Sequence, residues 1–302
     1  MVMAAVLLES EKIARPWLVG SRSKIPQNLT CVDPELLSRP DGEALVETLL
    51  AMPKYRHLSR EDALKKIHDP LVLACLFLKT AQVGGFVGGA TRSTTDTLRA
   101  VLSIIGLSPQ APTLFGFFLI ERRSTESTSR SIVLLADCAV IPDPSPKQLA
   151  QIAIGAAEAF KFFMQEETRV AFLSFSTLGS AAHPGVDKVR NALHAARERA
   201  PGICFEGEWQ ADAALDPFSA EIKGAGHSSM AGKANVLVVP DLNCGNIAYK
   251  LVQRLGQCRA VGPVLWGAAR PANDLSRGCS TEDVVNMVAL TALEAQAKKI
   301  LS

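Results

Sequence analysis

The stretch ANVLVVPDLNCGNIAYKLVQRLG, residues 234–256, decides the fold class of this 302-residue chain. ANVLVVPD predicts a strand, LNCG a turn, and NIAYKLVQRLG a helix with apolar residues at helical spacing. The same order recurs nearby: RVAFLSFST (169–177) predicts a strand, VDKVRNALHAARERA (186–200) a helix, and ICFEGEW (203–209) a strand. Strands that alternate with helices predict an α/β fold, with mostly parallel sheets and helices on both faces.

The segments outside this region support the same fold class. TLFGFFLIE (113–121) is almost continuously apolar, as expected for a strand covered on both faces. AVGPVLWG (260–267) predicts another strand, and residues 281–301 predict the final helix. Residues 60–80 predict two helices that Pro70 separates, and a glycine-rich loop (84–89) precedes a helix expected near Thr97. Ligands of such sheets bind beyond the carboxyl ends of the strands, so the following loops are the predicted binding loops.

Composition narrows the class of function. The formal net charge is +2, so bulk charge points to neither a nucleic-acid partner nor a membrane surface. No stretch is apolar over the roughly 20 residues that a membrane helix needs. The chain has seven cysteines without a CxxC pair, which favours reduced thiols and a cytoplasmic location over a disulfide framework or a zinc site.

Two familiar phosphate- and nucleotide-binding motifs are absent. GHSSMAGKA (226–234) resembles a P-loop, but five residues separate its two glycines instead of four, and Ala234 replaces the hydroxyl residue that would hold magnesium. GAGHSS (224–229) has two glycines of a dinucleotide fingerprint but not the third. The five histidines form no metal-ligand spacing, so the sequence predicts no metal site.

NDLSRGCSTEDVV, residues 273–285, has the pattern of a helix start. Ser280 is the predicted N-cap, and Asp283, three residues later, completes a capping box. Local physics therefore explains Asp283 as a capping acid, Arg277 as a surface cation and Ser276 as a turn residue. Whether these three residues also do chemistry is left open by this segment alone.

Four segments together resemble one family. They are GGATRSTTDTLRA (88–100), FLSFSTLGSAAHPGVDKV (172–189), GKANVLVVPDLNCGNIAYKLVQRL (232–255) and GPVLWGAARPANDLSRGCSTEDVVN (262–286). In order and spacing they resemble the phosphate acetyltransferases and the related phosphate butyryltransferases. The resemblance is dense from about Ser131 to the C-terminus and is traceable to about Ala4.

The resemblance implies a two-domain α/β fold like that of isocitrate and isopropylmalate dehydrogenases, with the active site in a cleft between the domains. The expected domains are residues 1–110 plus 271–302, with the family's N-terminal strand apparently missing, and residues 111–270. It further implies a homodimer and the reversible reaction of acetyl phosphate with coenzyme A. Coenzyme A and acetyl-CoA are then substrates, no cofactor is tightly bound, and no metal is needed.

The resemblance also assigns catalytic residues. Asp283 matches the general base for the coenzyme A thiol, Arg277 the cation on the acyl phosphate, and Ser276 a hydroxyl donor to the reacting oxygen. A thiol has a pKa of roughly 8.5 and an ordinary aspartate about 4, so this base needs help from its surroundings. A guanidinium binds phosphate in two-pronged fashion, which lysine does not imitate well.

The predicted substrate-binding residues lie in several segments. Arg99 matches a family arginine for phosphate or coenzyme A, and Arg56 more weakly matches another near the nucleotide. The remaining candidates, each with an ordinary structural explanation beside the functional one, are Ser93, Thr94, Ser176, Thr177, Gly179, Ser180, Asn246, Tyr249 and Lys250. Ser93 and Thr94 are also good helix caps, and residues 176–180 also fit a plain strand-to-helix turn.

Two positions depart from the family pattern. Arg92 stands where histidine is common, and Leu178 stands where lysine is common. Two alternatives also stay open. One is a phosphate butyryl- or propionyltransferase, because a methylene in a pocket is worth only about 1–3 kcal/mol. The other is a non-catalytic domain that senses acetyl-CoA, like the one at the end of some malic enzymes.

Overall fold

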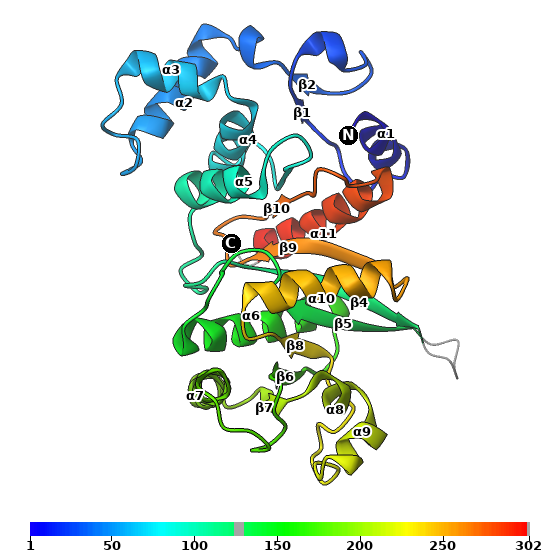
Figure 1. The fold of residues 1–302 in the computed structure, drawn as a ribbon. Coiled ribbons are helices and arrows are strands. Elements are labelled where there is room, and N and C mark those ends of the chain that lie inside the picture. The colour runs from blue at the N-terminus through cyan, green and yellow to red at the C-terminus, as the bar shows by residue number, and fades with distance from the viewer. Residues whose placement is uncertain (124–129, 301–302) are drawn as a thin grey trace. The chain divides into compact units, whose positions relative to one another are not determined.

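A computed structural model describes residues 1–123 and 130–300 of the chain. The chain divides into two compact units, which are considered separately (Figure 1). Unit 1 comprises Met1–Pro109 and Ala268–Ser302, and unit 2 comprises Gln110–Gly267. The expected domain limits and the expected cleft between domains stay predictions.

Unit 2 is built on a six-stranded sheet. Its strands are β4 (Phe115–Arg123), β5 (Arg130–Ala136), β6 (Arg169–Leu173), β7 (Cys204–Trp209), β8 (Val236–Val238) and β9 (Ala260–Trp266). Their order across the sheet is β7-β6-β8-β5-β4-β9. The neighbours from β7 to β5 pair in parallel, while β4 runs antiparallel to both β5 and β9. The prediction of a mostly parallel sheet is confirmed.

Helices cover both faces of this sheet. They are α6 (Pro146–Met164), α7 (Pro184–Arg199), α8 (Ala211–Leu215), α9 (Pro217–Ile222) and α10 (Leu242–Arg254). Phe117 of β4 meets Phe163 of α6, while Phe118 joins a core with residues of α8, α9 and α10. Because successive side chains of a strand point to opposite faces, α6 and the α8–α10 segment lie on opposite sides of the sheet.

Local sequence explains where these helices begin. Ser145 and Gln148 form a reciprocal capping box at the start of α6, and Pro146 occupies the first turn. The Asp241 side chain caps α10 by accepting a hydrogen bond from Cys244 N. Pro217 is the first residue of α9, which follows α8. The helices therefore start where side chains can satisfy the free backbone N–H groups.

Unit 1 is mainly helical. Its α-helices are α1 (Val2–Ser10), α2 (Arg39–Leu50), α3 (Arg60–Ile67), α4 (Pro70–Lys79), α5 (Thr94–Ala100) and α11 (Thr281–Ile300). Two 3-10 turns, η1 (Arg22–Lys24) and η2 (Pro34–Leu36), and a π-helical turn, η3 (Val101–Ile105), connect them. The predicted break at Pro70 is confirmed, with Asp69 capping α4. No helix in the described ranges has both the length and the apolar character to cross a membrane.

Two short parallel strand pairs complete unit 1. β1 (Leu18–Val19) pairs with β2 (Cys31–Val32), and β3 (Phe86–Gly88) pairs with β10 (Ala272–Asp274). Each strand of the second pair leads into a loop and then a helix, α5 after β3 and α11 after β10 (Figure 1). The second pair therefore brings together two segments that are far apart in the sequence.

Candidate active site

The loops after β3 and β10 meet at one edge of their sheet. Gly88 and Asp274, the last residues of the two strands, are register partners, and Leu275 N donates a hydrogen bond to Gly88 O at 2.6 Å. Parallel strands end at the same edge, so the loop carrying Ser93 lies beside the loop carrying Ser276. This juxtaposition gathers the predicted residues of unit 1 from two distant parts of the sequence.

The loop between β10 and α11 exposes two of the three predicted catalytic side chains. Ser276 Oγ accepts a hydrogen bond from Gly278 N at 3.2 Å, which is the expected turn interaction, and its hydroxyl hydrogen is left to donate elsewhere. Arg277 is exposed and forms no ion pair with any described carboxylate. An exposed, unpaired guanidinium beside a hydroxyl is suited to an anionic ligand.

Asp283 is a helix cap and still has a free oxygen. Its Oδ2 accepts hydrogen bonds from Ser280 N at 2.8 Å and Ser280 Oγ at 2.9 Å, while Asp283 N donates to Ser280 Oγ at 3.1 Å. These bonds are the predicted capping box. Oδ1 has no hydrogen bond among the described residues, and the side chain is exposed. Capping therefore occupies one oxygen and leaves the other available for a proton.

Ser93 is committed to the start of α5. Its Oγ accepts a hydrogen bond from Asp96 N at 3.1 Å and donates to Asp96 Oδ2 at 2.7 Å. The helix starts at Thr94, earlier than expected, because Ser93 caps it. Arg99, on the same helix, pairs with Asp96 at 3.3 Å and stays mostly exposed. Arg92, at the position that departs from the family, pairs with Asp69 at 3.2 Å.

The two predicted coenzyme A arginines belong to neighbouring segments. Tyr55 precedes Arg56, and its hydroxyl lies 2.7 Å from Ser103 Oγ. Ser103 Oγ in turn donates to Arg99 O at 2.6 Å. Two lysines, Lys54 and Lys66, place their Nζ atoms 5.9 and 5.8 Å from the Tyr55 ring centroid. A tyrosine that sequence reasoning missed thus ties the Arg56 turn to the helix of Arg99 within a basic surface.

Asp274, the residue at the end of β10, has an unusual environment. Its side chain is buried, and neither carboxylate oxygen accepts a hydrogen bond of normal geometry from the described residues. Burial raises the pKa of the Asp274 carboxyl, while the Thr94 and Thr97 hydroxyls and Leu275 N–H oppose the rise. The sequence pattern assigned no role to Asp274, although this residue lies in the NDLS segment, residues 273–276.

The loop of residues 174–181 in unit 2 is held by a buried glutamate. Glu208 accepts two hydrogen bonds from Arg190, Nε at 2.9 Å and Nη2 at 3.0 Å, one from Ser176 Oγ at 2.6 Å, and one from Gly179 N at 2.8 Å. Burial raises the pKa of the Glu208 carboxyl, but these donors outweigh it and hold the pKa at about 2. The glutamate is therefore ionised and fully partnered.

The backbone N–H groups of the same loop already have hydrogen-bond acceptors. The N–H groups of residues 177–181 all donate within the chain, to Ser180 Oγ, Glu208 O, Glu208 Oε1, Thr177 O and Ser176 Oγ in turn. Ser176 and Thr177 are buried, whereas Gly179 and Ser180 are exposed. A phosphate bound here would have to meet side chains, so the proposed backbone cradle stays a prediction without a free N–H to support it.

The three predicted residues of α10 have different surroundings. Asn246 Nδ2 donates to Cys138 O at 3.2 Å, and Lys250 Nζ donates to Asn246 Oδ1 at 2.6 Å. Tyr249 stacks on Phe118, with ring centroids 3.8 Å apart, and burial raises the pKa of its phenol. Gly245 lies against Asp137 O so closely that a Cβ would overlap it. Lys250 alone of the three is exposed.

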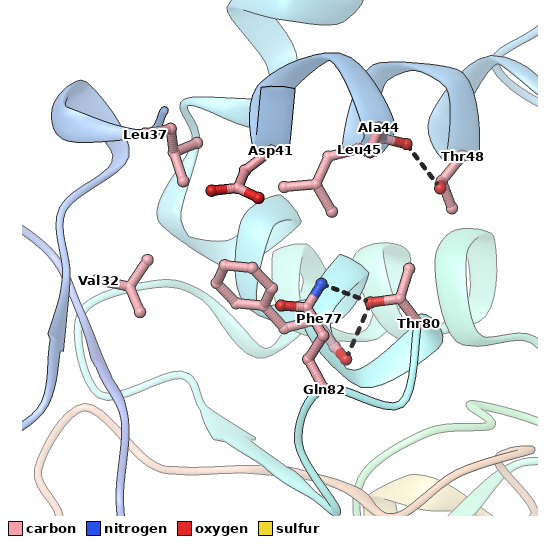
Figure 2. A pocket seen from close by; sticks show the side chains of 9 residues that line it. All are labelled: Val32, Leu37, Asp41, Ala44, Leu45, Thr48, Phe77, Thr80 and Gln82. Atoms are coloured by element: carbon pink, nitrogen blue, oxygen red, sulfur yellow. Dashed lines mark hydrogen bonds between the residues drawn. The ribbon is translucent and has the colours of Figure 1, made fainter. Parts of the chain in front are cut away.

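One pocket in unit 1 lies away from all of these residues. Figure 2 shows it between α2 and α4, with Val32 of β2 at one side and Asp41, Leu45, Phe77 and Gln82 around it. Gln82 Nε2 donates to Thr80 Oγ1 at 3.1 Å within it. None of the predicted site residues lines this pocket.

In the described parts of the chain, no cluster of three or more His, Cys, Asp and Glu is arranged to hold a metal ion.

Polar loops that follow parallel strands, with an exposed arginine and a carboxylate at a helix start, are typical of α/β proteins that bind small anionic ligands. Comparison with known proteins identifies the family to which the chain belongs. The family described as phosphate acetyl/butaryl transferase matches residues 1–292. The chain belongs to this family.

Individual proteins of this family are similar to nearly the whole chain. The phosphate acetyltransferase of Clostridium acetobutylicum is 41% identical over 98% of this chain and 91% of its own length. That of Paracoccus denitrificans is 41% identical over 97% and 91%. The crystal structure of a phosphotransacetylase from Streptococcus pyogenes superimposes with a TM-score of 0.86, at 38% identity, covering 98% of this chain and 90% of that one.

Proposed function

We propose that the chain is a phosphate acetyltransferase, which reversibly transfers the acetyl group between acetyl phosphate and coenzyme A. Family membership and relatives of that activity over nearly the whole chain support this function. The single observation that carries the chemical proposal is that exposed Ser276 and Arg277, on the loop after β10, are followed by exposed Asp283 in the first turn of α11. Among the described residues, Arg277 has no ion-pair partner and Asp283 Oδ1 accepts no hydrogen bond.

In the proposed reaction the Asp283 carboxylate takes the proton of the coenzyme A thiol. The thiolate sulfur attacks the acetyl carbon, a C–S bond forms, and the bond from that carbon to the phosphate oxygen breaks. Phosphate leaves with the electron pair of that bond. Arg277 stabilises the negative charge on the phosphate oxygens, and Ser276 donates a hydrogen bond to the reacting oxygen.

The remaining residues are proposed to bind substrate. Arg99 and Arg56 lie on the basic surface around Tyr55 and suit the phosphates of coenzyme A. Thr94 lies at the edge where the two unit 1 loops meet. From unit 2, the exposed Gly179, Ser180 and Lys250 are the stronger candidates. Ser176 and Thr177 are buried and Asn246 and Tyr249 half-buried, and all four have partners in the chain. We propose that these four shape the site and do not contact the substrate.

The test is formation of acetyl-CoA from acetyl phosphate and coenzyme A, followed by thioester absorption. We expect turnover without an added cofactor. A folded protein that binds acetyl-CoA tightly but does not form it would support the sensing module instead. Parallel assays with propionyl and butyryl phosphate decide acyl-chain preference, and faster turnover of a longer chain would overturn the acetyl assignment.

We further propose that the enzyme is a cytoplasmic homodimer. All seven cysteines are free thiols, which suits a reducing compartment. In unit 2, α10 buries only Gly245, while Ile247, Leu251 and Leu255, spaced four apart on one face, are 55%, 51% and 79% exposed. Such an apolar stripe suits a second copy. Sedimentation should give a dimer for the wild-type chain and a monomer for Leu251→Asp; a wild-type monomer would overturn the proposal.

A further inference from the structure

Asp274 is a buried carboxylate whose oxygens accept no hydrogen bond of normal geometry from the described residues. Its side chain is 1% exposed, and both oxygens lack a partner of normal geometry in the described chain. Burying an ionisable group without compensation costs several kcal/mol in general. Unsatisfied groups of this kind are rare in folded proteins, so each one calls for an explanation.

The neighbouring residue on β10 shows what an ordinary structural group looks like. Asn273 is fully buried, and its Nδ2 donates to Thr291 Oγ1 of α11 at 2.8 Å. Thr291 Oγ1 donates onward to Met287 O at 2.7 Å. This polar pair ties β10 to α11 and is satisfied. Because successive residues of a strand point to opposite faces, Asp274 points away from this pair.

Asp274 instead meets the segment that follows β3. Gly89 adopts φ +101°, and a Cβ there would overlap Asp274 Oδ1 and crowd Leu275 N and O. The Thr94 and Thr97 side chains of α5 lie near the carboxyl group. Thr97 is itself fully buried. The carboxyl group therefore stands between the loop that leads to Ser93 and Thr94 and the loop that leads to Ser276 and Arg277.

We propose that Asp274 is a positioning residue for the acetyl transfer, which sets the loop of Ser276 and Arg277 against the start of α5. This inference rests on the proposed function. Asp274 lies two residues before Ser276 and three before Arg277, so a shift at Asp274 moves both side chains. A displacement of about 1 Å at reacting groups can lower a rate by about 100-fold. A carboxylate kept at a stability cost at this point is expected to serve activity.

The test is Asp274→Asn, which keeps the shape and removes the ionisable group. We expect kcat to fall about 10- to 100-fold, KM for coenzyme A to stay nearly unchanged, and the melting temperature not to fall. The matched control is Thr291→Val, which removes the Asn273 partner. It should lower the melting temperature and leave kcat of the folded protein unchanged. A purely structural Asp274 would behave like Thr291.

A second variant keeps the inference testable if Asp274→Asn does not fold. Thr97→Val removes one of the two threonine hydroxyls near the carboxyl group while keeping the side-chain shape, and we expect a several-fold fall in kcat. Wild-type kcat in a folded Asp274→Asn variant, or in Thr97→Val when Asp274→Asn is unfolded, overturns the inference. Failure of the wild-type chain to form acetyl-CoA would instead overturn the proposed function.

Discussion

Asp274 in unit 1 and Glu208 in unit 2 are buried carboxylates with opposite environments. Both stand near the carboxyl end of a strand, and their side chains are 1% and 2% exposed. Glu208 accepts four hydrogen bonds, two of them from Arg190, and its pKa is held at about 2. Asp274 accepts none of normal geometry among the described residues, and burial raises its pKa.

The difference distinguishes a carboxylate that stabilises the fold from one that is expected to serve the reaction. A carboxylate with all its donors in place fixes the loop around it, and losing it is expected to cost stability. A buried carboxylate without such donors lowers stability and is expected to matter for activity. Variants at the two regions should therefore affect different quantities, the free energy of unfolding for Glu208 and the turnover rate for the unit 1 loops.

The largest effect on stability is expected for Glu208→Ala. It leaves Arg190 beside a vacated site and removes the acceptor of Ser176 Oγ and Gly179 N. Glu208 is buried, while the Arg190 side chain is 37% exposed. A donor left without its acceptor costs about 1–3 kcal/mol, so the loss of these hydrogen bonds together should cost about 3–5 kcal/mol. Chemical denaturation measures this loss. The control is Asp212→Ala, which breaks the exposed pair with Lys223 at 2.6 Å and should cost less than about 1 kcal/mol. Equal losses would contradict the comparison.

The pH dependence of stability sharpens the same prediction. The ordinary pKa of a glutamate is 4.5, and in the folded chain that of Glu208 is about 2. Because the folded value is lower, folding favours the ionised form. This contribution is complete above about pH 4.5 and is lost as the pH falls toward 2. Glu208→Ala should therefore lose most of its stability deficit relative to wild type in that acid range.

A smaller free-energy change, seen only in kinetics, is expected for Arg277→Lys. Lysine keeps the charge but cannot bind phosphate with two parallel N–H groups. We expect kcat/KM for acetyl phosphate to fall about 100-fold, or about 2.7 kcal/mol, with an unchanged melting temperature. The control Arg39→Lys changes an exposed arginine of α2 that pairs with Glu43 and should leave the rate alone. Near-normal kinetics for Arg277→Lys would exclude two-pronged phosphate contact.

The smallest effect is expected for Ser280→Ala. The variant removes one cap of α11 and should cost about 1 kcal/mol of stability. It also frees Asp283 Oδ2 from the Ser280 hydroxyl, so the rate should be kept or increased. Ser59→Ala removes the corresponding cap of α3 and serves as the control for stability. A large loss of rate in Ser280→Ala would show that the cap holds Asp283 in its working position.

The sequence predicted much of this architecture because the longer elements have strong local signals. The apolar runs of β4 and β8, the capping residue Ser280 and the break at Pro70 all have local causes and are found where expected. The family and the function were predicted from the resemblance of four segments, because these segments follow the order and spacing of the family along the chain.

Other features could not be predicted from the sequence because tertiary contacts create them. β3 and β10 are three residues each, and their glycine, asparagine and aspartate residues have weak strand propensity. They form because they pair with each other across a long sequence separation. The role of Glu208 was likewise hidden, since its partners Arg190, Ser176 and Gly179 are at least 18 residues away. Neither periodicity nor capping rules report such pairs.

The role of Asp283 as the base for the coenzyme A thiol is tested most directly by the turnover and melting temperature of Asp283→Asn. The amide oxygen of asparagine can still accept the hydrogen bond from Ser280 N, so α11 should keep its cap. We expect a folded variant with an unchanged melting temperature that has lost most acetyl-CoA formation. A variant that loses melting temperature and keeps the wild-type rate would contradict this role, because Asp283 would then be a cap and nothing more.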